Sequence, residues 1–272
     1  MSAAPLVVLP SARRARSGRT GVLLTNLGTP DAPKVPEVRR YLAEFLSDPR
    51  VIDIHPVARW LLLNLIILRT RPAESAEAYE KVWTEEGSPL LVHSENLTKG
   101  VAERLGGEFV VELAMRYGNP SLAHGMSRLV EADVDRIIVF PLYPQYASAS
   151  TGSTLEAIYA WAAQQPGVPP LTVVPPFFDH PAYVRSVVSV TAPVLESFKP
   201  DYVLFSYHGV PERQVKATDP SGQHCLQKDN CCAELGPNNR LCYRAHCLAT
   251  TRAVAAALNL SEEEHGVSFQ SR

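Results

Sequence analysis

The sequence predicts an α/β protein in which a parallel sheet is covered by helices on both faces. Short runs of β-branched and apolar residues alternate along the chain with longer runs at helical spacing, which is the pattern of successive βαβ units. Hydrophobic residues make up 46% of the chain and charged residues 20%, enough for a sizeable core. The 272 residues lie near the ~250–300 at which a single core stops growing, so one large domain or two smaller ones are possible.

Six runs have the length and composition of strands, and eight have helical periodicity. The predicted strands are GVLLTNL (21–27), FVVELAM (109–115), RIIVFPL (136–142), LTVVPPF (171–177), YVLFSYH (202–208) and GVSFQS (266–271). The predicted helices are 35–47, 56–69, 74–86, 93–106, 120–132, 153–165, 181–198 and 246–259. Because ligands of such folds bind beyond the carboxyl ends of the strands, we expect the site in the loops that follow them.

The pattern divides the chain into a tail and two domains. We expect residues 1–20 to form a disordered tail, 21–198 a first domain, and 199–272 the first part of a second. The boundary is predicted at Lys199-Pro200-Asp201, after the long helix. The second domain would own only two strands, too few for an independently stable sheet, so either the two domains are not separate or the second is incomplete.

Charge and patterning exclude several classes of function. The 26 Lys and Arg nearly balance the 28 Asp and Glu, and a net charge of −2 provides no field to hold nucleic acid. The apolar run of the tail precedes its arginines, the reverse of a secretory signal, so we expect a cytoplasmic protein; an organelle transit peptide is the alternative. The most apolar stretch, Trp60 to Leu68, is too short for a bilayer span, which needs ~20 residues.

Two strand ends carry glycine or hydroxyl residues. Gly28 follows the first strand without the G-x-G-x-x-G pattern of a nucleotide fold, so we expect no nucleotide cofactor; Gly28 serves a tight turn or the approach of an anionic ligand. The loop after the third strand contains Tyr143, Tyr146 and Ser153 among small hydroxyl residues. Such a loop suits carboxylates or a flat ring, or else it caps the next helix.

Three further features are candidates for binding or catalysis. His208 ends a predicted buried strand, where it can act as a base or a ligand, or be structural. Arg116 follows the second strand and suits a carboxylate ligand or a surface ion pair. The helix over 57–68 is apolar on nearly every side and ends at Arg69, which fits a core helix or a lip that meets a membrane or an apolar ligand.

All five cysteines lie between Cys225 and Cys247, inside a predicted insert at 222–247. Their spacing is C-x5-C-C-x9-C-x4-C, without the paired C-x2-C of structural zinc. An odd number in so short a segment is a poor disulfide framework and favours metal binding in a reducing compartment. A zinc site, assisted by His224 or His246, and unligated thiols are the alternatives.

Taken together, GVLLTNLGTPDAP, EEGSPL, LAMRYGNP, PLYPQYASASTGS and FSYHGVPER resemble the ferrochelatases from about residue 20 onward. The resemblance implies two Rossmann-like halves around a cleft and insertion of ferrous iron into protoporphyrin IX without a nucleotide or redox cofactor. A chelatase for coproporphyrin or another divalent metal is the nearest alternative. The family's last quarter, including an acidic motif opposite the histidine, has no counterpart here, so we expect a fragment, a truncated product, or a non-catalytic porphyrin-binding module.

The resemblance also implies roles for individual residues. His208 matches the active-site histidine, either as the base or as the ligand of the ferrous iron. The other matches place Arg116, Tyr117, Tyr143, Tyr146, Ser153 and Arg69 at the porphyrin. The helix over 57–68 matches a lip that attaches peripherally to the membrane. Oligomeric state is not predicted.

For the cysteines, the resemblance favours a 2Fe–2S cluster, which some ferrochelatases carry in an internal insert. Such a cluster takes four thiolates. We expect Cys225, Cys242, Cys247 and one of the adjacent pair, Cys231 and Cys232, to supply them, because neighbouring cysteines seldom serve together.

Overall fold

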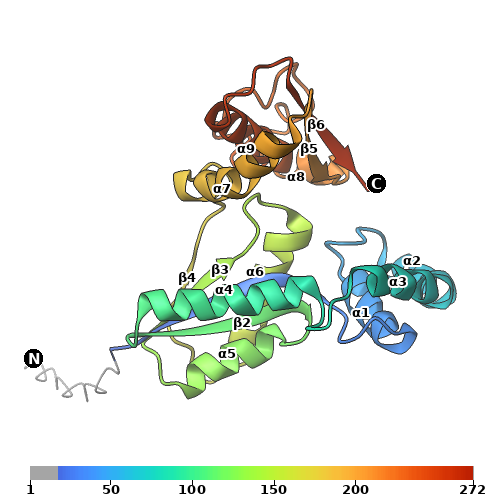
Figure 1. Cartoon of the computed structure of the whole chain (residues 1–272). Coiled ribbons are helices and arrows are strands. Elements are labelled where there is room, and N and C mark those ends of the chain that lie inside the picture. The colour runs from blue at the N-terminus through green and yellow to red at the C-terminus, as the bar shows by residue number, and fades with distance from the viewer. Residues whose placement is uncertain (1–17, 272) are drawn as a thin grey trace, which may run out of the picture.

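The computed structural model describes residues 18–271 as two lobes joined by one connecting segment (Figure 1). The first lobe runs from β1 to β4 and the second from α7 to β6. Of the tail expected at 1–20, residues 1–17 lie outside the described residues. Thr20, its last residue, is already the first residue of β1.

The first lobe contains a four-stranded parallel sheet in the order β2-β1-β3-β4. Its strands are β1 (Thr20–Thr29), β2 (Phe109–Gly118), β3 (Arg136–Pro141) and β4 (Leu171–Val173). Alternate residues of β1 point to opposite faces. Leu23 packs in the cluster formed with α5 (Leu122–Glu131) and α6 (Ser153–Ala163), whereas Val22 and Leu24 pack on the side of α4 (Pro89–Leu105). The predicted parallel sheet with helices on both faces is therefore confirmed.

The helices next to α1 (Val35–Ser47) differ from the prediction. One continuous helical run replaces the two expected at 56–69 and 74–86: α2 (Pro56–Leu61), the π-helical η1 (Leu62–Ile67) and α3 (Leu68–Val82). The gap between the two predicted helices contains Pro72, and proline removes the hydrogen bond to the carbonyl four residues earlier. That carbonyl, of Leu68, accepts instead from Arg39 Nε at 3.2 Å, so the helix continues through Pro72.

The second lobe pairs β5 (Val203–His208) with β6 (His265–Gln270) in parallel. Its helices are α7 (Pro181–Phe198), α8 (Glu212–Ala217) and α9 (Tyr243–Ala257). Helix α7 packs against α9 and so belongs with this lobe, although the sequence placed it at the end of the first domain. The chain crosses between the lobes before α7, not after it.

The carboxyl ends of the strands face the space between the lobes. Gly28 sits near the end of β1 with φ of 111°, and a Cβ there would collide with the Tyr117 carbonyl. The glycine is therefore explained by the close approach of β1 and β2.

Candidate functional site

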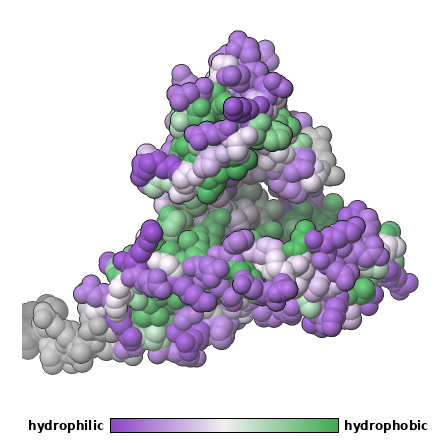
Figure 2. Space-filling view, viewed as in Figure 1, coloured by the Kyte–Doolittle hydropathy of each residue, from purple (hydrophilic) through white to green (hydrophobic). Residues whose placement is uncertain are grey.

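A cavity of about 480 Å³ lies between the two lobes. Its walls come from the ends of β1 and β5, from the loop after β3, and from α1, α4, α8 and α9. Within residues 18–271 its lining contains no Lys, Arg, Asp or Glu. Figure 2 shows the hollow with apolar side chains on the facing surfaces. Its volume falls in the range of about 300–1,000 Å³ of small-molecule sites.

His208 reaches this cavity from the end of β5, as the sequence predicted. The strand end is held by Gly209, whose N–H donates to the carbonyl of Gln270 on β6 at 2.6 Å. The imidazole is exposed, and so it is open to a ligand in the cavity. Tyr243 of α9 lines the same wall beside the main chain of His208, and burial raises the pKa of Tyr243, which keeps its hydroxyl protonated.

The two tyrosines of the loop after β3 have different environments. Tyr143 lines the cavity, and its hydroxyl lies 3.4 Å from Thr154 Oγ1. Burial raises the pKa of Tyr143 to about 12, so it presents a neutral hydroxyl. Tyr146 is not among the described residues of the cavity lining, and its main-chain N–H donates to His246 Nδ1 at 3.1 Å.

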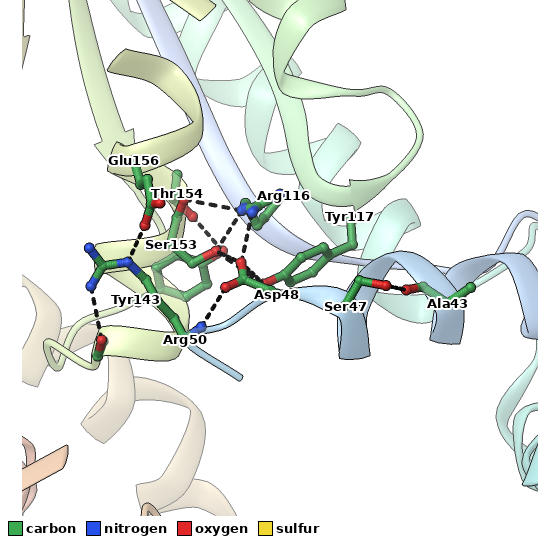
Figure 3. Close-up of polar contacts among 11 residues, drawn as sticks. Ala43, Ser47, Asp48, Arg50, Arg116, Tyr117, Tyr143, Ser153, Thr154 and Glu156 are labelled. Carbon is green, nitrogen blue, oxygen red and sulfur yellow. Dashed lines mark hydrogen bonds and ion pairs between the residues drawn. The ribbon is translucent and has the colours of Figure 1, made fainter. Parts of the chain in front are cut away.

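Arg116, Tyr117 and Ser153 converge on Asp48, a residue the sequence analysis missed (Figure 3). Asp48 Oδ2 accepts from Arg116 Nη2 at 2.7 Å, from the Tyr117 hydroxyl at 2.8 Å and from Ser153 Oγ at 2.5 Å. Arg116 also donates through Nε to Ser153, and its Cζ lies 4.4 Å from the centre of the Tyr117 ring. The guanidinium charge is therefore already balanced inside the first lobe.

Hydrogen bonds set the charge of Asp48. Its burial acts to raise the carboxyl pKa, but hydrogen bonds from Ser153, the Arg50 main chain and Tyr117, together with the Arg116 charge, lower the pKa below its usual value. Asp48 is thus a stable anion. In the sequence it reads only as the Asp-Pro stop of a helix, and no spacing links it to Arg116.

The network lies outside the cavity wall. Tyr117 and Ser153 are fully buried, and none of the three predicted substrate contacts is among the described lining residues. Contact of Arg116, Tyr117 and Ser153 with substrate therefore stays a prediction. Arg69 is exposed at the start of α3, away from this lining, and its role also stays a prediction.

A second charged pair flanks the loop. Arg50 forms an ion pair with Glu156, and its Nη1 donates to Ser148 Oγ at 3.0 Å (Figure 3). Across the lobes, Arg213 Nε pairs with Asp53 at 2.9 Å, and Gln214 donates to the Arg50 carbonyl at 3.1 Å. These contacts join α8 of the second lobe to the segment after α1.

The cysteine segment buries all five thiols, and none is in a disulfide. Four pack as one cluster: Cys225, Cys231, Cys232 and Cys242. The sulfurs of the adjacent pair lie 3.7 Å apart, and Arg244 Nη1 lies within 3.8 Å of both. A hydrogen bond from Cys232 lowers the pKa of the Cys242 thiol, despite burial, which favours a thiolate there.

Cys247, which the sequence nominated as a ligand, lies outside this cluster and hydrogen-bonds with Tyr243. The structure thus brings together both members of the adjacent pair, where one had been expected. Across residues 18–271, no group of three or more His, Cys, Asp or Glu side chains already has a metal-binding arrangement. The four clustered thiols supply the donor chemistry of an iron–sulfur site.

Two polar side chains, those of Asp219 and Asn239, order the main chain of this segment through hydrogen bonds. Asp219 accepts the N–H groups of His224 at 2.7 Å and Cys225 at 2.9 Å. Buried Asn239 donates to the carbonyls of Cys231 at 2.9 Å and Glu234 at 2.8 Å. Both are turn-forming residue types, but only their buried placement distinguishes them from ordinary loop residues.

Comparison with known proteins adds an independent observation. The family model described as Ferrochelatase matches residues 19–272. A ferrochelatase of Coxiella burnetii is 46% identical over 256 residues, covering 94% of this chain and 71% of that protein. A ferrochelatase of Opitutus terrae is 46% identical, covering 92% of this chain and 73% of that protein. A ferrochelatase of Bdellovibrio bacteriovorus is 39% identical, covering 94% of this chain and 75% of that protein.

Proposed function

The chain belongs to the ferrochelatase family and inserts ferrous iron into a porphyrin in haem biosynthesis, and we propose that the reaction takes place in the cavity between its lobes. The observation that carries this proposal is the position of His208, exposed on the cavity wall opposite the loop of Tyr143.

The chemistry requires a group that handles protons at the ring centre. Iron replaces the pyrrole N–H protons of a planar macrocycle, so a proton acceptor must stand over the ring. A histidine accepts protons near neutral pH and also binds iron, and His208 serves as the acceptor, the iron ligand or both in turn. Burial raises the pKa values of Tyr143 and Tyr243 and keeps their hydroxyls neutral, so the imidazole of His208 is the candidate proton acceptor of the described lining.

The walls favour protoporphyrin IX over coproporphyrin. Coproporphyrin carries propionates where protoporphyrin carries vinyl groups, and each additional carboxylate needs a cation or several donors. The described lining holds no cation and includes apolar side chains such as Leu27, Phe45 and Leu90. Vinyl groups fit such walls better than carboxylates do.

The test is anaerobic metallation of both porphyrins by the chain, followed by the change in porphyrin absorption. We expect protoporphyrin to be metallated with the higher kcat/KM. Preference for coproporphyrin would overturn the substrate assignment, whereas porphyrin binding without metallation by either would support the binding-module alternative.

The cysteine segment is proposed to hold a 2Fe–2S cluster. The residues that would hold it are Cys225, Cys231, Cys232 and Cys242, which are buried together and lie beside Arg244. A bound cluster would cross-link the segment through iron–thiolate bonds. A zinc ion on the same thiols is the alternative, and metal analysis distinguishes the two.

The helical run at 56–68 is proposed to attach the protein to a membrane surface. Val57, Trp60 and Ile66 expose 59%, 59% and 56% of their surface; Arg59 lies within this run and the exposed Arg69 follows it. An exposed apolar patch beside arginines fits the interface of an anionic bilayer. In the part of the chain that the structure describes, no helix has the length and apolarity of a bilayer span.

A further inference from the structure

His246, on α9, is completely buried at the junction of the two lobes. Its ring stacks on Phe178 of the connecting segment, with ring centres 3.8 Å apart and planes 15° from parallel. The mechanism proposed above makes no use of this side chain.

Both ring nitrogens of His246 have fixed partners. The Tyr146 N–H can only donate, so Nδ1, at 3.1 Å, must be the unprotonated acceptor. The Arg240 carbonyl can only accept, so Nε2, at 2.9 Å, must carry the hydrogen. The two contacts together require the neutral Nε2–H tautomer, and burial acts in the same direction by lowering the pKa of His246. With both nitrogens occupied, His246 is not free to assist a zinc ion, as the sequence had allowed.

The two partners belong to different functional regions. Tyr146 lies in the loop after β3, between Gln145 and Ala147, which both line the cavity. Arg240 lies in the cysteine segment, two positions before Cys242. The imidazole therefore connects the cavity loop of the first lobe to the cysteine segment of the second.

The side-chain hydroxyl of Thr250 makes a second contact between α9 and the same loop. Gln145 Nε2 donates to Thr250 Oγ1 at 2.9 Å, and that hydroxyl lies 2.8 Å from the Phe178 carbonyl. Thr250 is buried one turn after His246 on α9. Helix α9 thus contacts two consecutive residues of the loop, Gln145 and Tyr146. Because these contacts are buried, they hold the loop more firmly than exposed contacts would.

We propose that His246 is a positioning residue that holds the porphyrin-facing loop at Tyr146 and transmits the order of the cysteine segment to it. The proposal rests on the function proposed above in one respect, namely that this loop faces porphyrin. A change in the order of the cysteine segment near Arg240, or metal binding there, then changes how firmly Gln145 and Ala147 are held, through the imidazole ring of His246.

Two substitutions of His246 test its contact with Tyr146 and its contact with Arg240 separately. In His246→Asn, the amide oxygen lies near the place of Nδ1 and keeps an acceptor for Tyr146. In His246→Gln, the longer side chain places its amide near Nε2, so it keeps a donor for Arg240 but loses the acceptor. The matched control is His124→Gln, on the exposed surface of α5.

The experiment is amide hydrogen exchange of the loop at 145–148 in the full chain, together with protoporphyrin binding followed by fluorescence quenching. We expect His246→Gln to raise loop exchange and weaken porphyrin binding about tenfold, as for one unsatisfied buried donor. His246→Asn should keep the loop protected but loosen the cysteine segment. In the unaltered chain, the ¹⁵N spectrum of His246 should show the Nε2–H tautomer.

Loop exchange in His246→Gln equal to that of His124→Gln would overturn the proposal, as would the Nδ1–H tautomer. Equal loosening of both regions by the Asn and Gln variants would reduce His246 to a packing role and also overturn it. If no variant and no unaltered chain binds porphyrin, the proposed function fails, while the exchange data still decide the positioning role.

Discussion

The first lobe buries its apolar side chains on both faces of a four-stranded sheet, whereas the second lobe exposes Val190, Phe198 and Leu204 on α7 and β5. In the first lobe the fully buried residues are mainly aliphatic and aromatic; in the second, the buried cluster that contains Val215 consists largely of cysteines. The difference shows that the two lobes are stabilised differently. Apolar burial and the buried Asp48–Arg116 ion pair stabilise the first lobe. Hydrogen bonds from polar side chains and the interlobe contacts of α8 and α9 stabilise much of the second.

The largest expected effect is on catalysis and comes from the second lobe. His208→Ala should lower metallation ~10²–10⁴-fold, the usual cost of losing a general base. The exposed side chain contributes little packing, so the unfolding temperature and porphyrin binding should stay close to those of the unaltered chain. The control is His124→Ala on the first lobe. A His208→Ala variant that keeps more than about a tenth of the turnover would contradict the assignment.

The largest expected effect on stability lies in the first lobe. Asp48→Asn leaves the Arg116 charge without its counter-ion in a site where the carboxylate is only 4% exposed. We expect the free energy of unfolding to fall by about 3 kcal/mol. This is the low end of the range for a broken buried ion pair, because the Arg116 side chain is 19% exposed. Denaturant titration measures it.

The same pair predicts a pH dependence. Because the pKa of Asp48 is lowered on folding, its contribution is complete above the usual aspartate value of about 4 and is lost as the pH falls through the lowered pKa. Asp48→Asn should remove this acid-sensitive part of the stability curve. If stability fell with pH in the same way in Asp48→Asn and in the unaltered chain, other carboxylates would be responsible for the loss of stability in acid.

Removal of a metal should have its largest effect in the cysteine segment of the second lobe. Anaerobically prepared protein should be coloured, with iron and sulfide bound, and Cys242→Ser should bleach it and expose the segment at 222–247 to protease. Cys247→Ser is the matched control and should stay coloured. Colourless protein containing zinc would overturn the iron–sulfur assignment, and bleaching by Cys247→Ser would overturn the choice of ligands.

Exposed apolar residues should behave differently in the two lobes. Trp60→Glu with Ile66→Glu should release the protein from anionic liposomes in a sedimentation assay without lowering its unfolding temperature. The matched control is Val190→Glu with Val194→Glu, on the equally exposed α7, which should leave liposome binding unchanged. Equal release by both pairs would show that binding is not specific to the 56–68 run.

The smallest effect is expected at the exposed ion pair beside the loop. Arg50→Gln breaks the contact with Glu156, whose side chain is 56% exposed. Surface pairs contribute ~0–1 kcal/mol, so the free energy of unfolding should change by less than that of Asp48→Asn. A loss as large as for Asp48→Asn would contradict the description of this contact as a surface ion pair.

Local sequence pattern was enough to predict the six strands, most of the helices, and the position of His208 at the end of a strand beside the cavity. Strands and helices follow from local periodicity, because each residue's burial repeats with the geometry of its own element. The same periodicity placed Tyr143 in a loop beyond the sheet, and the cavity lies there.

Contacts between groups that are remote in the sequence became visible only in the folded chain. Asp48 and Arg116 are far apart in sequence, and their pairing depends on the path of the chain between them. Likewise, spacing could not show that Cys247 faces Tyr243 while Cys231 and Cys232 share one cluster. It also could not show that Arg39 satisfies the carbonyl freed by Pro72, or that His246 joins the lobes. Charge pairing and hydrogen bonding act between atoms a few ångströms apart, and local pattern carries no record of such distances between remote segments.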